Sequence, residues 1–286
     1  MPHYYYMKLV RPQIALVLPA LCVFTSYIVA SDGYMSYDIL FPMICAVLLH
    51  ASGIVQNDIH DAEIDKGRAE KPIASGHIKK NYAIVFGALL FAAAMAVAVL
   101  SMNYVLVLAA GMAAILGSAY NSKRFGLWGN ILVGMVPSSY GILGWGGYTH
   151  QIFDLRLLFV LVAYYFGGLS MGFTANFYDY KTEMKRGGKT LPIIYGVKKA
   201  AAITTLIRCL AITSCMLLLV SAELIHPVTV AMMIILSILA VIVHKYLLGS
   251  EERKNAEKAF KITILFNNIL FLAIIAGVVL KYRIGS

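Results

Sequence analysis

The side chains best suited to chemistry gather first in residues 57–65, which read NDIHDAEID. Asn57, Asp61 and Asp65 are spaced four residues apart in this segment. Asp58 precedes Asp61 by three residues, so an α-helix would place the amide and the three carboxylates on one broad face. Like charges at this spacing repel and destabilise a helix, so we expect cations to neutralise them. Because every donor is an oxygen, the hard ions Mg²⁺ and Ca²⁺ suit the site.

A second polar cluster lies at residues 176–183, which read NFYDYKTE. Asn176, Asp179 and Glu183 follow an i, i+3, i+7 spacing, which again gives one helical face. Each cluster is followed by a basic, glycine-containing loop that could bind an anion. The basic residues of these loops include Arg68 and Lys71 after the first cluster, and Lys185 and Lys189 after the second. The repeated arrangement indicates a weak internal duplication.

The rest of the chain is unusually apolar. Of its 286 residues, 60% are hydrophobic and only 13% are charged, which exceeds what a soluble domain of this length would carry. The uncharged runs are residues 12–31, 39–57, 81–122, 125–153, 157–178, 224–244 and 262–280. Since a membrane-spanning helix needs about 20 apolar residues, we predict an all-α membrane protein with nine transmembrane helices. We expect residues 1–286 to form a single integral-membrane domain.

The net charge of +10 is distributed unevenly between the predicted loops. Most of the 24 Lys and Arg residues fall in loops that would lie on one side of the membrane together with the N-terminus. The positive-inside rule then predicts a cytoplasmic N-terminus and a C-terminus on the opposite side. This topology accounts for the basic balance, so no nucleic-acid partner is expected.

Two carboxylate clusters with basic loops beside them indicate a particular kind of ligand. A diphosphate satisfies both, because Mg²⁺ can bridge its oxygens while Lys and Arg bind the remaining ones. The clusters end apolar runs, so the substrate should be amphiphilic, and a polyprenyl diphosphate fits. Ionisation of such a donor would give an allylic carbocation, which aromatic side chains can stabilise. A nucleophile held nearby would then capture the cation.

These motifs resemble those of a known family. Residues 57–65 resemble the NDxxDxxxD motif of the UbiA superfamily of intramembrane prenyltransferases. Residues 179–183 and the GKTLP segment at 188–192 resemble its second acidic motif and the loop that follows. Residues 120–124, YNSKR, resemble its loop between the fourth and fifth helices, and residues 71–76, KPIASG, resemble its RPxxSG segment. The resemblance covers nearly the whole chain.

The resemblance implies nine helices around a central cavity that opens to the cytoplasmic side, and it assigns roles to the motif residues. The expected Mg²⁺ ligands are Asn57, Asp58, Asp61, Asp65, Asn176, Asp179 and Glu183. The residues expected to bind the diphosphate are Arg68, Lys71, Lys123, Lys185 and Lys189. Tyr120 would lie near the reacting carbon, and we expect Asp61, Asp179, Tyr120 and Lys123 to be essential for catalysis.

The acceptor stays open at this point. The family joins prenyl chains to glyceryl phosphates of archaeal lipids and to aromatic acceptors such as 4-hydroxybenzoate. The PIASG and TLPIIYG segments most resemble the archaeal-lipid branch, which favours geranylgeranylglyceryl phosphate, with an aromatic quinone precursor as the alternative. A third alternative, an ion-coupled transporter, would also keep carboxylates within the membrane, but near its midplane.

Three features of the apolar runs have open interpretations. His50 lies seven residues before Asn57 on the same helical face, and either faces a cavity or bonds between helices. Arg208 either faces a polar cavity or extends to the membrane surface. The glycine-rich run at 125–153 predicts a helix that is either broken or closely packed.

Overall fold

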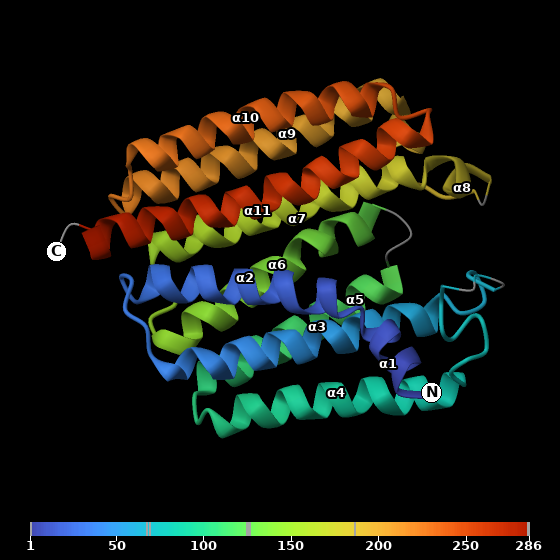
Figure 1. Ribbon diagram of the computed structural model, residues 1–286, viewed down its shortest axis with the longest axis horizontal. Helices are drawn as coiled ribbons and strands as arrows, with labels where there is room; N and C mark the ends of the chain where they lie inside the picture. The colour runs from blue at the N-terminus through green and yellow to red at the C-terminus, as the bar shows by residue number, and fades with distance from the viewer. Residues whose placement is uncertain (1, 67, 69, 124–126, 186, 285–286) are drawn as a thin grey trace.

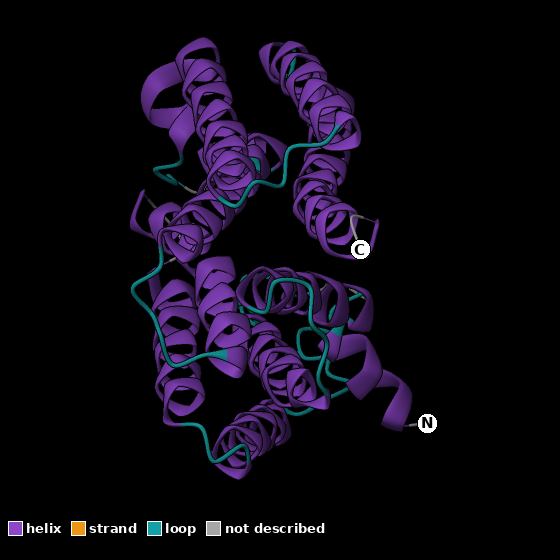
Figure 2. Cartoon of the chain, turned by 90° about the vertical axis from the view of Figure 1, so that its left-hand side faces the viewer, coloured by secondary structure: helices purple, strands orange, loops and turns teal. Residues whose placement is uncertain are grey.

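The computed structural model describes residues 2–66, 68, 70–123, 127–185 and 187–284, and within these ranges it is helical with no strand. The helices are α1 (Pro2–Val10), α2 (Pro12–Ala30), η1 (Tyr37–Ile39), α3 (Leu40–His60), α4 (Lys80–Leu100), α5 (Tyr104–Lys123), α6 (Leu127–Tyr148), α7 (Leu155–Tyr178), α8 (Tyr180–Lys185), α9 (Leu191–Ser221), α10 (Pro227–Leu248) and α11 (Arg253–Ile284). The long helices run side by side along one direction, as Figure 1 shows. Seen from one end of the bundle, the loops gather at the helix ends (Figure 2). The predicted all-α class is confirmed for the described part.

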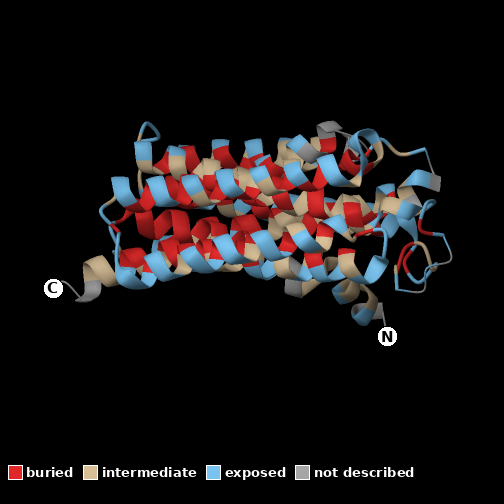
Figure 3. Cartoon of the chain, turned by 90° about the horizontal axis from the view of Figure 1, so that it is seen from above, coloured by how far each residue is buried: buried red, intermediate tan, exposed pale blue. Residues whose placement is uncertain are grey.

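Seven of the described helices are long and apolar enough to cross a membrane, namely α3, α4, α5, α7, α9, α10 and α11. Helices α1 and α2 form a pair bent by 44°, which makes up to eight spans if the pair counts as one. Exposed residues lie along the outer faces of the helices (Figure 3). Many of these are large and apolar, such as Leu89, Leu108 and Val241, which suits contact with lipid. The predicted number of nine spans stays a prediction.

The glycines of α6 explain how this helix packs. A Cβ atom at Gly134 would lie 2.7 Å from the carbonyl oxygen of Tyr165 in α7, and one at Gly144 would clash with the backbone of Val23 in α2. Small residues therefore let three helix backbones approach one another. Helix α6 is continuous through Pro137, so the predicted close packing is confirmed and the predicted break is wrong.

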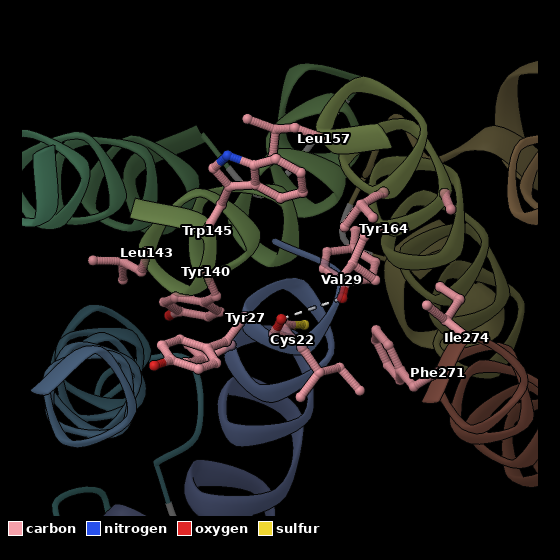
Figure 4. Packing of buried hydrophobic residues seen from close by; sticks show 14 of the residues in the cluster. Cys22, Tyr27, Val29, Tyr140, Leu143, Trp145, Leu157, Tyr164, Phe271 and Ile274 are labelled. Atoms are coloured by element: carbon pink, nitrogen blue, oxygen red, sulfur yellow. Dashed lines mark hydrogen bonds between the residues drawn. The ribbon is translucent and has the colours of Figure 1, made fainter. Parts of the chain in front are cut away.

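Aromatic side chains fill the core where α2, α6, α7 and α11 meet. Tyr27, Tyr140, Trp145, Tyr164 and Phe271 are buried together there, as the close view in Figure 4 shows. The Tyr164 hydroxyl donates a hydrogen bond of 3.2 Å to the Cys22 carbonyl, which ties α7 to α2. This core fixes α7, whose far end carries the second acidic motif.

Both acidic motifs lie where helices end. Helix α3 ends at His60 and α7 ends at Tyr178, and Figure 1 shows both ends on the right-hand side of the bundle. We call this side the acidic end. The predicted helical face is therefore wrong beyond the helix, because Asp61 caps α3 and Asp65 lies in the turn that follows. The turn still keeps them close, since the Asp61 and Asp65 amides bond to the carbonyls four residues before them, at 3.0 and 2.8 Å.

Candidate functional site

A cavity of about 340 Å³ lies within the bundle and is lined by residues of α2, α3, α4, α5, α6, α7 and α11. Most of its wall is apolar or glycine, including Leu49, Gly53 and Pro137. Asn57 of the first acidic motif also lines it, so the cavity reaches the acidic end. Ligand sites are typically apolar cavities with a few polar groups, and this one has room for a hydrocarbon chain beside a polar end.

The carboxylates of the first motif are buried at the acidic end. Asp58, Asp61 and Asp65 are 3%, 6% and 7% exposed, respectively. Asp58 Oδ1 accepts hydrogen bonds from Arg11 at 2.6 Å and from Lys71 at 2.7 Å. Lys71 also lies 3.4 Å from Asp65 Oδ2. Arg11 and Lys71 therefore supply positive charge beside the clustered carboxylates. Lys71 contacts both Asp58 and Asp65.

Asp58 keeps acceptor capacity. Its Oδ2 is buried and has no hydrogen-bond partner among the residues that the structure describes. A buried carboxylate oxygen without a partner is costly, which is unusual in a region made only for stability. This oxygen is available to a cation or a hydrogen-bond donor that arrives with a ligand.

Arg11 is a functional candidate that the sequence reasoning missed. It lines the cavity, and it lies between α1 and α2 with a left-handed backbone, φ 52° and ψ 67°. A left-handed conformation costs roughly 1–2 kcal/mol for a residue other than glycine. Arg11 also precedes a proline, which restricts its backbone further. The ion pair with Asp58, 47 positions away in the chain, helps to offset that strain.

Arg68 is held in the loop after the first motif. Its Nε donates to Glu70 at 2.7 Å and its Nη1 donates to Asp65 at 2.9 Å. The hydrogen bond to Glu70, followed by the bond to Asp65, raises the pKa of Arg68, and the Arg68 bond lowers the pKa of Glu70. The guanidinium therefore stays charged and is aimed at the acidic end.

The second motif is more open than the first. Asn176 is a half-buried residue of α7, Asp179 caps that helix and is exposed, and Glu183 is half-buried in α8. Gly188 donates its amide to the Glu183 carbonyl at 2.9 Å, and a Cβ at this glycine would lie 2.6 Å from Glu183 Oε2. The glycine thus lets the basic loop fold back against the motif, and Lys189 follows it at an exposed position.

The end of α5 lies beside the first motif. Tyr120 lines the cavity, and its predicted place near the reacting carbon stays a prediction. Asn121 donates to the Gly53 carbonyl at 3.0 Å and fixes α5 against α3. The side chains of Lys123 and Lys185 lie outside the described residues, so their predicted roles stay predictions.

The two open predictions for polar residues within the apolar helices, His50 and Arg208, have different outcomes. His50 both lines the cavity and contacts the Tyr140 hydroxyl at 3.1 Å, so its two interpretations hold together. Arg208 is 0% exposed and does not line the cavity, so both predicted interpretations are wrong. Its guanidinium is bound instead by the hydroxyls of Thr174 and Thr263, from α7 and α11.

The donor set at the acidic end fits Mg²⁺ in chemistry, although the described residues hold no group of three His, Cys, Asp or Glu side chains arranged around a metal position. Mg²⁺ usually binds through one or two carboxylates together with waters and substrate phosphates. Buried Asp oxygens match that mode of binding, and one of them, Asp58 Oδ2, has no partner among the described residues. A complete protein cage is not required.

Apolar helices, a cavity among them and carboxylates at its charged end define an integral membrane protein whose cavity suits an amphiphilic ligand. The profile of the UbiA prenyltransferase family matches residues 16–275. The chain therefore belongs to this family of intramembrane prenyltransferases, as its motifs predicted.

Individual relatives agree with this assignment. The digeranylgeranylglyceryl phosphate synthase of Sulfurisphaera tokodaii is 28% identical over 198 residues, which cover 68% of this chain and 71% of that protein. A solved structure of a digeranylgeranylglyceryl phosphate synthase superposes with a TM-score of 0.78 at 23% identity, covering 97% of this chain and 99% of the other. A UbiA homologue from Archaeoglobus fulgidus, solved with GPP and Mg²⁺ bound, gives 0.69 at 18% identity, covering 94% and 99%. The similarity to these two solved structures establishes the fold of this chain.

Proposed function

We propose that this protein transfers a geranylgeranyl group from geranylgeranyl diphosphate to geranylgeranylglyceryl phosphate, with Mg²⁺ as its cofactor. The observation that carries the proposal is an apolar cavity whose wall includes Asn57 and Arg11, next to the buried carboxylate of Asp58. The hydrocarbon tail fits the apolar wall, and the diphosphate fits the charged end. The similarity to digeranylgeranylglyceryl phosphate synthases supports the choice of acceptor.

The carboxylate and amide residues of both motifs would hold the metal. They are Asn57, Asp58, Asp61, Asp65, Asn176, Asp179 and Glu183. When bound, Mg²⁺ neutralises the diphosphate and makes it a better leaving group. The Asp58 oxygen that has no partner in the described part of the chain, and the short turn that follows α3, support this role for the first motif.

Basic residues would bind the diphosphate from several sides. We assign this role to Arg68, Lys71, Lys123, Lys185 and Lys189, and we add Arg11. Arg11 and Lys71 both donate to Asp58 and lie at the charged end, where their remaining N–H groups can reach an anion. Tyr120 lies on the cavity wall, where its ring can face the allylic carbon as positive charge develops.

A cation on the cavity wall favours a phosphorylated acceptor over an aromatic one. Arg11 is a cavity-lining cation in addition to those of the predicted loops. A diphosphate donor and a phosphorylated acceptor bring more negative charge to this end than a donor with an aromatic acid. The transporter alternative is disfavoured because both acidic motifs lie where helices end, away from the middle of the bundle.

We further propose that the single domain crosses the membrane nine times with its N-terminus in the cytoplasm. The crossings are the seven qualifying helices, the bent pair α1–α2, and α6, a helix of 22 residues. The N- and C-termini lie at opposite ends of the bundle in Figure 1, which agrees with an odd number of crossings. The cavity would then open at the acidic end towards the cytoplasm.

The proposal is tested by a transfer assay on the purified protein with Mg²⁺ and radiolabelled geranylgeranyl diphosphate. Geranylgeranylglyceryl phosphate and 4-hydroxybenzoate are offered in parallel reactions. We expect a radiolabelled ether lipid with the first acceptor and no product with the second. A product with 4-hydroxybenzoate alone would assign the enzyme to quinone synthesis and overturn the proposed acceptor.

A further inference from the structure

The cavity wall carries a polar pair away from the acidic end. His50 Nδ1 lies 3.1 Å from the hydroxyl oxygen of Tyr140, which joins α3 to α6, and both residues line the cavity. His50 precedes Asn57 by two helical turns, or about 10 Å along the helix axis. The pair is thus placed further into the bundle than the residues proposed to bind metal and diphosphate.

The surroundings of the pair are apolar. Leu49, Pro137 and Gly168 share the cavity wall with it. An ionisable side chain inside a membrane protein is costly to keep, and it generally faces a cavity and marks a function. A hydrophobic residue of similar size would fill the position of His50 without this cost, so its chemistry is the feature to explain.

His50 uses only one of its two ring nitrogens. Nδ1 is engaged by Tyr140, whereas Nε2 has no hydrogen-bond partner within the described ranges. If Nδ1 carries the hydrogen and donates it to the Tyr140 oxygen, Nε2 presents a lone pair. The tyrosine oxygen can accept this hydrogen, so the pair is compatible with the tautomer in which the second nitrogen accepts a proton.

The proposed reaction requires a proton acceptor in this place. When the hydroxyl of the acceptor attacks an allylic cation, its oxygen becomes positively charged until the proton leaves. The carboxylates of the first motif are the groups proposed to hold the metal, and two of them, Asp58 and Asp65, are also paired with Arg11, Lys71 and Arg68. Among the described residues, the imidazole of His50 has no cation as a hydrogen-bond partner.

We propose that His50 is the general base of the transfer and that Tyr140 positions it, an assignment that rests on the function proposed above. The acceptor oxygen forms a bond to the first carbon of the prenyl chain. The bond from that carbon to the diphosphate oxygen breaks, and the electron pair leaves with the diphosphate. The hydroxyl proton passes to His50 Nε2, and it returns to water when the products leave.

The chain offers a matched control for the histidine. His244 of α10 pairs through Nδ1 with the Thr205 hydroxyl of α9 at 2.8 Å, so it also bonds two helices together. Like His50 it is half-buried, but it does not line the cavity. A purely structural role would make His50→Ala and His244→Ala behave alike.

The experiment compares these two variants in the transfer assay, with diphosphate release and prenyl transfer measured separately. General bases typically contribute about 10²–10⁴-fold, so we expect His50→Ala to lower kcat for transfer by at least about 10²-fold. The KM for the donor should change little, and diphosphate release should continue without matching transfer. Added imidazole should restore part of the transfer, and Tyr140→Phe should show a smaller loss of kcat.

Several results would overturn the assignment. Transfer by His50→Ala within about twofold of the wild type would exclude His50 as the base, and the proposed function would stand. Equal losses in His50→Ala and His244→Ala, with no rescue by imidazole, would show a structural role. If the wild type itself transfers to neither acceptor, the proposed function fails, and the assignment of His50 fails with it.

Discussion

The two ends of the bundle pair carboxylates with basic groups in different ways. At the end opposite the acidic motifs, Arg156 bonds to Asp32 at 2.8 Å and to Asp154 at 2.9 Å. Tyr282 of α11 also donates to Asp32 at 2.8 Å, so this network joins the ends of α2, α7 and α11. At the acidic end, Asp58 is almost fully buried and one of its oxygens has no partner in the described part of the chain.

The carboxylates at the two ends differ in how deeply they are buried. This difference indicates a structural role at one end and ligand binding at the other. The Asp32 side chain is 54% exposed, whereas that of Asp58 is 2% exposed. Exposed ion pairs cost little and contribute little, while buried ones carry a desolvation cost that often exceeds their attraction. Buried carboxylates next to a cavity therefore contribute little to stability. Their position is best explained by a ligand that binds to their oxygens.

The largest expected effect is on the metal ligands. Asp61→Ala or Asp179→Ala should lower transfer by about 10³-fold or more, because metal stabilisation of the leaving group is worth several kcal/mol. The transfer assay measures this loss, and size-exclusion chromatography with a thermal melt verifies folding. Near-normal turnover in either variant would contradict the assignment of the acidic end.

A change of metal should have the next largest effect. Ca²⁺ should replace Mg²⁺ poorly, because it prefers more ligands and longer bonds than the compact octahedral site of Mg²⁺. The rate of transfer is compared at saturating concentrations of each ion after treatment with a chelator. Equal rates with both ions would argue against metal-assisted ionisation at the acidic end.

Substitution of one arginine at each end tests directly whether the two ends have different roles. Arg11→Ala should raise the KM for the donor about tenfold, because a charge-assisted hydrogen bond contributes roughly 1.5–3 kcal/mol. Arg156→Ala should lower the thermal midpoint and leave this KM unchanged. An effect of Arg11→Ala on stability alone, or a raised KM for the donor in Arg156→Ala, would contradict the different roles of the two ends.

The smallest expected effect is the pH dependence of stability at the end of the bundle that carries Asp154 and Arg156. Burial alone would raise the pKa of Asp154, but hydrogen bonds from the Arg156 side chain and backbone outweigh it and lower the pKa from 3.8. The stabilisation is therefore complete above pH 3.8 and is lost as the pH falls through the lower, folded-state value. Asp154→Asn should cost less than about 1 kcal/mol at neutral pH, since the pair is partly exposed.

Thermal melts of wild type and Asp154→Asn across pH 3–7 would show this linkage. The gap in midpoint between the two proteins should narrow towards the acid limit. A gap that widens as the pH falls would contradict the lowered pKa. Transfer activity should be the same in both proteins at neutral pH.

The motifs and the apolar runs were enough to predict the helical membrane fold and the cluster at the end of α3. They were not enough to place Asp61 and Asp65, which continue the helical spacing in sequence but follow the end of the helix. A charged segment that leaves an apolar helix turns where solvation and nearby cations favour it, and spacing alone does not contain that information.

Contacts between distant residues account for the other differences. Arg11 reads in sequence as one of several basic residues that set topology, and only the fold brings it to Asp58. Arg208 reads as a cavity or surface residue, whereas threonines from two neighbouring helices enclose it. In both cases helix packing determines which residue is the partner, and the local pattern of the sequence contains no information about this packing.

The most direct test of the central claim is a structure determined with Mn²⁺ and a non-reactive thio-analogue of geranylgeranyl diphosphate. Anomalous scattering locates the metal. We predict metal at the acidic end, in contact with Asp61 and Asp179, with the tail in the cavity beside Tyr120. Metal or diphosphate bound away from both acidic motifs, or a tail outside the cavity, would contradict the account.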